Sequence, residues 1–178
     1  MKSASELEPE NTALRIDTAW AHAMHGELQA ALGDALEILQ EAPENNKAHI
    51  LHAQLLMDLG RDEEAIAAFQ SALEFGARNP AMLVDIGKKQ IGLGRLEDSL
   101  ASFVLAANQS PVLQSAWIGQ AIVNIEMKRF QAADIALKRV EVLAELQPGG
   151  ADPVVGEIRS QLTALQQEGT REDGGADR

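Results

Sequence analysis

The residues best suited to acid–base or metal chemistry are four histidines, all within residues 22–52 of the 178-residue chain. His22 and His25 are three residues apart, and so are His49 and His52. In a helix this spacing places both members of a pair on one face. The pattern allows a zinc, copper or nickel site, or a pH-sensitive joint in which His22 approaches His52. We favour a simpler interpretation, polar side chains near an interface, because the sequence specifies no cysteine or carboxylate partner.

The sequence contains no pattern typical of cysteine chemistry, phosphate binding or a catalytic triad. The absence of cysteine excludes disulfides, thiol nucleophiles and cysteine-ligated metal clusters. Gly92-Leu93-Gly94 lacks the preceding strand and the following Lys-Ser/Thr of a phosphate-binding loop. No Ser, His and Asp can be grouped into a catalytic triad beyond chance proximity. We therefore expect a protein that is not an enzyme and holds no cofactor or metal.

Charge and hydropathy argue against nucleic acid and membranes as partners. The chain has 15 Lys and Arg against 27 Asp and Glu, a net charge of −12. Such a chain repels phosphate backbones and anionic lipid surfaces. No apolar run approaches the roughly 18 residues of a membrane span, and residues 1–6 lack the apolar stretch of a secretory signal. These features predict a soluble, cytoplasmic protein.

The elements that carry these residues repeat with a fixed period. Gly26, Gly60 and Gly94 are 34 residues apart, and the next step reaches Lys128. Small residues recur seven positions before and five positions after each of these four: Ala19, Ala53, Gly87 and Ala121; Ala31, Ala65, Ser99 and Ala133. Self-similarity at a fixed period of this length is typical of repeat proteins.

These columns of residues resemble those of the tetratricopeptide repeat family. The resemblance covers residues 12–147 as four repeats: 12–45, 46–79, 80–113 and 114–147. The first repeat departs from the family pattern at Ala35, where a large residue is usual, and the fourth at Lys128, where a turn glycine is expected. The resemblance implies an all-α, right-handed solenoid of antiparallel helix pairs.

Helical periodicity supports the same fold. Within residues 63–75 the apolar residues recur at the i, i+3, i+4 and i+7 spacing of an amphipathic helix: Ala65, Ile66, Phe69, Ala72 and Leu73. Small residues on successive helices let their backbones approach closely. No helix pair buries its apolar face alone, so neighbouring pairs must stack.

The two ends differ from the repeats. Residues 1–11 are polar and contain Pro9, which predicts a flexible leader. After Gln147-Pro148-Gly149-Gly150, we expect a capping helix over residues 152–168 with Asp152 as its N-cap. Its apolar stripe should cover the end of the fourth repeat. Residues 169–178 are rich in glycine and charge and should be disordered.

The resemblance also implies a concave groove lined by the first helix of each pair. The columns that would line it hold Ile16, Trp20, Met24, Ile50, Gln54, Met57, Val84, Lys88, Ile91, Ile118, Ile122 and Ile125. Most of these side chains are apolar, and an exposed apolar strip marks an interaction site. The competing interpretation is that a tight superhelix or the leader buries them. Trp117 lies in the family's packing column, so we expect it in the core.

Within that set, Trp20, Met57, Val84, Lys88 and Ile122 are the strongest candidates for partner contacts. The sequence predicts a non-catalytic adaptor that binds an apolar or amphipathic protein segment, rather than nucleic acid or membrane. The alternatives are a secretion-type chaperone that shields an apolar client segment, and a scaffold that assembles with copies of itself.

A carboxylate clamp of the kind that grips acidic chaperone C-termini is not predicted. The columns that carry Lys, Asn and Arg in such repeats hold Ile16 and Trp20 in the first repeat and Ala81 and Asp85 in the third.

Overall fold

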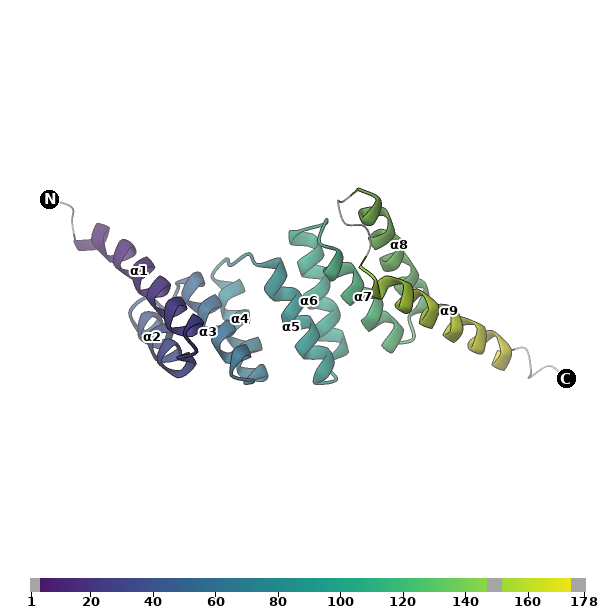
Figure 1. The fold of residues 1–178 in the computed structure, drawn as a ribbon, viewed down its shortest axis with the longest axis horizontal. Coiled ribbons are helices and arrows are strands. Elements are labelled where there is room, and N and C mark those ends of the chain that lie inside the picture. The colour runs from purple at the N-terminus through teal and green to yellow at the C-terminus, as the bar shows by residue number, and fades with distance from the viewer. Residues whose placement is uncertain (1–3, 147–151, 174–178) are drawn as a thin grey trace. The chain divides into compact units, whose positions relative to one another are not determined.

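The structure, a computed structural model, consists of helices joined by short turns (Figure 1). It describes residues 4–146 and 152–173, with side chains over residues 11–146 and 152–167. In these ranges the helices are α1 (Ala4–Met24), α2 (Leu28–Glu41), α3 (Asn46–Asp58), α4 (Asp62–Glu74), α5 (Pro80–Gly92), α6 (Leu96–Gln109), α7 (Gln114–Glu126), α8 (Phe130–Leu146) and α9 (Val154–Asp173). No residue in the described ranges lies in a strand.

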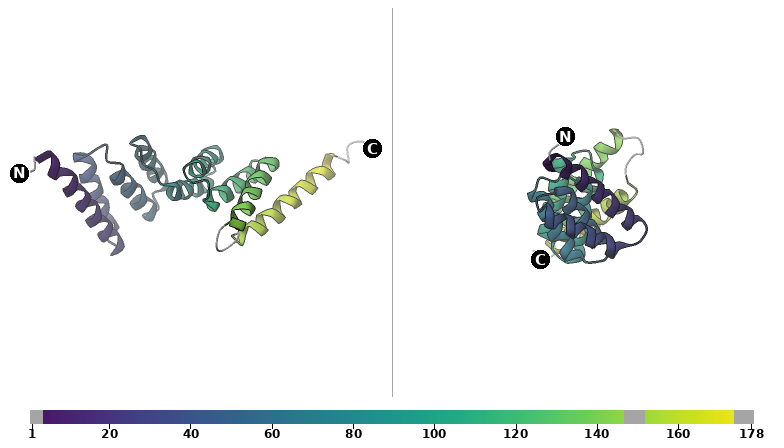
Figure 2. Two further views of the ribbon diagram at one scale, coloured as in Figure 1. Left: turned by 90° about the horizontal axis from the view of Figure 1, so that it is seen from above. Right: turned by 90° about the vertical axis from the view of Figure 1, so that its left-hand side faces the viewer.

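The helices fall into two compact units, unit 1 over residues 1–78 and unit 2 over residues 79–178. In unit 1, α1 packs on α2, α3 packs on α4, and both α1 and α2 contact α3. In unit 2, α5 packs on α6, α7 packs on α8, and α7 also contacts α5 and α6. The two helices of a pair lie side by side in both Figure 1 and Figure 2. Each unit therefore contains two stacked helix pairs.

The four turns inside the pairs share one backbone geometry. Gly26, Gly60, Gly94 and Lys128 have φ angles of +84°, +72°, +71° and +58°. At Gly60, for example, its amide donates to the Met57 carbonyl, and the amide of Arg61 donates to the Leu56 carbonyl. The other three turns have the same two hydrogen bonds at equivalent positions. This Schellman pattern ends a helix with a left-handed residue, usually glycine. Lys128 adopts the conformation despite its side chain.

The first helix of three pairs begins where the 34-residue period begins a repeat, at Asn46, Pro80 and Gln114. Asn45 caps α3 by accepting hydrogen bonds of 3.1 Å from the amides of Lys47 and Ala48. Asn79 caps α5 by accepting from the Met82 amide at 3.1 Å. Capping oxygens satisfy amides that have no partner inside the helix.

The two columns of small residues form the contacts within each pair. Seven of the eight have no exposed surface: Ala19, Ala53, Ala121, Ala31, Ala65, Ser99 and Ala133. The eighth, Gly87, is also buried. In the third pair the columns are joined directly, because the Ser99 hydroxyl donates to the Gly87 carbonyl at 2.7 Å. Close backbone approach, expected from the sequence, is therefore how the helices pack.

Helix α9 packs on both α7 and α8. Its apolar residues Val155, Ile158 and Leu162 are buried in one cluster, the C-terminal cluster, with residues of α7 and α8 that include Ile118, Ile125 and Leu137. Arg159 bonds to Asp134 and to Glu141 on α8, with 2.7 Å between its Nη2 and Glu141 Oε1. The helix expected at residues 152–168 therefore covers the last pair.

Both ends differ from the sequence expectation. Helix α1 begins at Ala4, within the residues 1–11 expected to be a flexible leader, and Pro9 lies inside its N-terminal part. Helix α9 runs to Asp173, into residues 169–178 that were expected to be disordered. Residues 174–178 lie outside the described residues. Among the helices that the structure describes, none is both long and apolar enough to cross a membrane.

Candidate functional site

The twelve predicted groove residues lie on the first helix of each pair, six in each unit. In unit 1 they are Ile16, Trp20 and Met24 on α1 and Ile50, Gln54 and Met57 on α3. In unit 2 they are Val84, Lys88 and Ile91 on α5 and Ile118, Ile122 and Ile125 on α7. Their exposure decides which of them a partner can reach.

Four of the twelve are core residues rather than open groove residues. Ile16, Val84, Ile118 and Ile125 are 6%, 3%, 8% and 6% exposed. Ile16, Val84 and Ile118, together with half-buried Ile50, stand in one column of the 34-residue period, so this column serves mainly to pack helices. Ile118 and Ile125 are buried in the C-terminal cluster, among residues of α8 and α9. The prediction that Val84 contacts a partner is therefore corrected, because Val84 is a core residue.

The predicted groove residues of unit 1 lie on α1 and α3, which pack against each other. Trp20, Ile50 and Met57 are half-buried there, and Met24 is 87% exposed. Gln54 is half-buried and donates from Nε2 to Asp58 Oδ1 at 3.0 Å, one helical turn away. We call Trp20, Ile50, Gln54 and Met57 the α1–α3 face.

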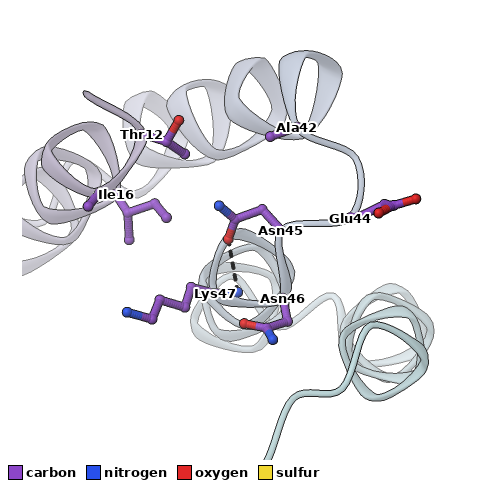
Figure 3. Close-up of a pocket in the computed structure, with 8 residues that line it drawn as sticks. Thr12, Ile16, Ala42, Glu44, Asn45, Asn46 and Lys47 are labelled. Atoms are coloured by element: carbon purple, nitrogen blue, oxygen red, sulfur yellow. Dashed lines mark hydrogen bonds between the residues drawn. The ribbon is translucent and has the colours of Figure 1, made fainter. Parts of the chain in front are cut away.

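A hollow of about 530 Å³ opens between α1 and the start of α3. Its lining is Thr12, Ala13 and Ile16 from α1, and Ala42, Glu44, Asn45, Asn46 and Lys47 from the α2–α3 loop and the first turn of α3. Figure 3 shows the Ile16 side chain and the Lys47 side chain extending into the same space. The hollow therefore combines an apolar wall with amide, carboxylate and ammonium groups.

Sequence reasoning did not find this hollow, although it contains Ile16. Asn45 and Asn46 are two of its five polar side chains, and Asn45 is fixed as the N-cap of α3. Asn46 donates from Nδ2 to the Phe75 carbonyl at 3.1 Å. An Asn-Asn pair before an apolar helix is a helix-start signal. This signal predicts the N-cap but gives no information about the cavity beside it.

The corresponding residues of unit 2 offer less apolar surface. Lys88 is exposed and its Nζ lies 3.3 Å from Asp85 Oδ1. Ile91 is half-buried. Ile122 is half-buried and packs against the C-terminal cluster. Most of the predicted groove residues of α7 are therefore engaged by α8 and α9.

Trp117 lies at the edge of the core. Its ring packs against the C-terminal cluster, and its indole Nε1 donates to the Pro111 carbonyl at 3.0 Å. The Arg139 guanidinium lies over the ring, 5.8 Å from its centroid. The hydrogen bond and the cation–π contact satisfy the polar side of a half-buried tryptophan.

The four histidines do not gather into one site. His22 Nδ1 lies 2.8 Å from Asp34 Oδ2, within the first pair. His49 Nε2 donates to the Pro43 carbonyl at 2.8 Å, and its ring stacks on Phe75 with 5.2 Å between centroids. His22 and His52 therefore have different surroundings. The described residues contain no group of three or more His, Cys, Asp or Glu that could hold a metal ion.

A second hollow, of about 370 Å³, lies between α2, α3 and α4. It is lined by Leu39, His49, His52, Leu56, Glu64, Ala67, Ala68 and Ser71. Burial lowers the pKa of His52 below its ordinary value, and the nearby His49 and Arg61 add to this, while Glu64 acts in the opposite direction. We call this the histidine hollow.

Comparisons with known proteins give structural matches only. No protein-family model matches the sequence, and no curated protein matches it significantly. A tetratricopeptide repeat protein from Parabacteroides merdae has a TM-score of 0.74 at 16% identity, covering 94% of this chain and 68% of that one. A MamA protein has a TM-score of 0.68 at 13% identity, covering 96% and 97%.

A third similar structure is the pilF protein of Pseudomonas aeruginosa, with a TM-score of 0.68 at 18% identity over 90% of this chain and 71% of that one. Identities this low show the fold. Together with the four Schellman turns at the 34-residue period, they confirm the expectation drawn from the sequence. The chain has the tetratricopeptide-repeat fold, an all-α solenoid class built from antiparallel helix pairs.

Proposed function

We propose that the protein is a non-catalytic interaction module that binds an apolar or amphipathic segment of another protein on the α1–α3 face. The observation that carries the proposal is the set of half-buried apolar side chains Trp20, Ile50 and Met57 on two helices that pack together. Tryptophan and methionine are enriched in protein interfaces, and methionine repacks around different partners.

The neighbouring hollow gives this face a polar end. Lys47 at its edge is exposed and has no ion-pair partner among the side chains that the structure describes. Its ammonium group can pair with an acidic residue of a bound segment whose apolar side chains contact the α1–α3 face. An apolar anchor beside a polar contact fixes both the position and the direction of a ligand.

Peptides selected from a displayed random library against the immobilised protein test this proposal. We expect apolar or amphipathic sequences, and a loss of affinity of about tenfold or more in Trp20→Ala and in Ile50→Glu. Ile135→Ala is the matched control, since Ile135 is an exposed apolar residue on α8. Equal affinity for wild type and both face variants, with unchanged helical content, would rule out the α1–α3 face.

Self-association is the second candidate function, and a separate observation on α1 supports it. Leu14 and Met24 on α1 are 66% and 87% exposed, so they are apolar side chains that a second copy could cover. Light scattering over a wide concentration range distinguishes the two. A concentration-dependent mass that Leu14→Glu and Met24→Glu abolish would favour self-assembly, and a constant monomer mass would favour binding of another protein. A secretion-type chaperone would use the α1–α3 face in the same way, to shield its client.

A further inference from the structure

Histidine is distributed unequally between the two units. All four histidines lie between residues 22 and 52, so unit 1 contains every one and unit 2 contains none. Histidine is the side chain whose ordinary pKa lies in the mildly acidic range. Any response to mild acid that depends on histidine must therefore originate in unit 1.

The surroundings of His52 disfavour a positive charge on its ring. It is half-buried in the histidine hollow, and no described residue forms a hydrogen bond or ion pair with its ring. Its charged neighbours are His49 on its own helix and Arg61 and Glu64 at the start of α4. Glu64 is already held by Arg61, with 2.8 Å and 2.6 Å between the guanidinium nitrogens and the two carboxylate oxygens.

The carboxylates of α2 do not serve as counter-ions for a protonated His52 either, because each already has another partner. Asp34 pairs with His22, and Glu37 and Glu41 both pair with Arg15 of α1. Helix α2 contributes only the apolar Leu39 to the histidine hollow. A proton on His52 would thus add a cation beside a guanidinium and a second imidazole, in a partly apolar environment.

We propose that protonation of His52 loosens the packing of α3 against α4 and α2, so that mild acid weakens the second helix pair while unit 2 is unaffected. The sign follows from linkage. Because the folded protein lowers the pKa of His52, the unfolded chain binds a proton at a higher pH than the folded chain. Stability is therefore full above the ordinary histidine value and decreases as the pH falls through it towards the folded pKa.

His22 provides a contrast within the same unit. Its ring faces the Asp34 carboxylate at 2.8 Å, within the first helix pair and outside the histidine hollow. His22→Gln is therefore the matched control for His52→Gln. Both substitutions remove one imidazole, but only His52→Gln removes the imidazole of the histidine hollow, whose protonation is proposed to weaken the packing.

Hydrogen exchange followed by mass spectrometry tests the proposal without any partner. Between about pH 7.5 and about pH 5.5, after correction for intrinsic rates, we expect protection of α3 and α4 to fall roughly threefold or more and that of α5–α8 to stay constant. His52→Gln should abolish the change, and His22→Gln should keep it. An unchanged wild type, an equal response of both units, or an undiminished response in His52→Gln would each overturn the proposal.

Titration of the wild-type protein by NMR tests the same coupling without a variant, and it can be used if His52→Gln does not fold. The His52 ring should titrate below the ordinary histidine value, and the amide signals of Ala68 and Ser71 on α4 should shift with the same midpoint. Titration of His52 without any matching shift on α4 would contradict the proposed coupling.

Discussion

The backbone of Gly119 on α7 lies directly against the ring of Phe103 on α6, so that a Cβ added to Gly119 would overlap the ring. Gly87 on α5 approaches the same ring, where an added Cβ would lie 2.8 Å from Cζ. Phe103 is 1% exposed. One aromatic ring therefore fills the space between two glycine-bearing helices of unit 2.

Replacing Gly119 tests this packing. Gly119→Ala should lower the free energy of unfolding by about 1–3 kcal/mol, because a buried ring must move to admit the methyl group. Gly33→Ala is the control, since Gly33 lies inside α2 with nothing within 4 Å of an added Cβ. That substitution should stabilise by about 0.5–1 kcal/mol through helix propensity. If urea unfolding shows Gly119→Ala to be as stable as Gly33→Ala, the described packing is wrong.

Lys128 carries strain that its three glycine counterparts avoid. Lys128→Gly should raise the free energy of unfolding by about 1 kcal/mol, because Lys128 has φ +58° and a left-handed conformation disfavours side chains. The reciprocal change Gly60→Ala, at φ +72°, should lower it by a similar amount. Thermal unfolding monitored by circular dichroism measures both. A destabilised Lys128→Gly would show that its side chain contributes more than the strain costs.

The positions of these turns could be predicted from the sequence, and so could the helix pairs. The 34-residue period marks the turn inside each pair, including the one at Lys128, because a Schellman turn needs a left-handed residue at a fixed position. Helix starts at Asn46 and Pro80 follow from capping chemistry that acts within a few residues.

Exposure of the first-helix side chains could not be predicted in the same way. Val84 and Ile118 share a column with half-buried Ile50, and their burial depends on which neighbouring helix covers that column. Ile118 and Ile125 share a cluster with residues of α8 and with residues of α9, which lies outside the repeats. The stacking of His49 on Phe75 likewise depends on the angle between α3 and α4, which no residue spacing specifies.

The difference in burial along the first helices has a direct consequence for stability. Ile118→Ala should destabilise by about 2–4 kcal/mol, since it leaves a cavity in the C-terminal cluster. Met24→Ala should change stability by less than about 0.5 kcal/mol, because Met24 is 87% exposed. Chemical unfolding of both variants checks this, and a large loss for Met24→Ala would place that side chain in an interface.

Helix α9 is joined to α8 by ion pairs from Arg159 to Asp134 and Glu141. Hydrogen bonds from Lys138 and then from Arg159 lower the pKa of Asp134. A lowered carboxyl pKa contributes stability that is present above the unfolded value and is lost as the pH falls towards the folded pKa. We therefore expect amides of α9 to lose protection in acid near the ordinary carboxyl range, ahead of those of α7.

Substitution of Asp134 provides the check on this assignment. Asp134→Asn should weaken protection of α9 at neutral pH and remove most of its acid dependence. Glu157→Gln, on the exposed part of α9, is the control and should change neither. The same acid dependence in Asp134→Asn would mean that another group controls the docking of this helix.

Mapping a selected apolar peptide onto the isotope-labelled protein by NMR tests directly whether α1 and α3 form the binding face. We expect the largest shifts at the Trp20 indole, the Ile50 methyl groups and the Met57 methyl group, with further shifts at the Lys47 amide beside the hollow. Shifts confined to the exposed apolar residues of α8, such as Ile135 and Val142, would contradict the assignment of the binding face to α1 and α3.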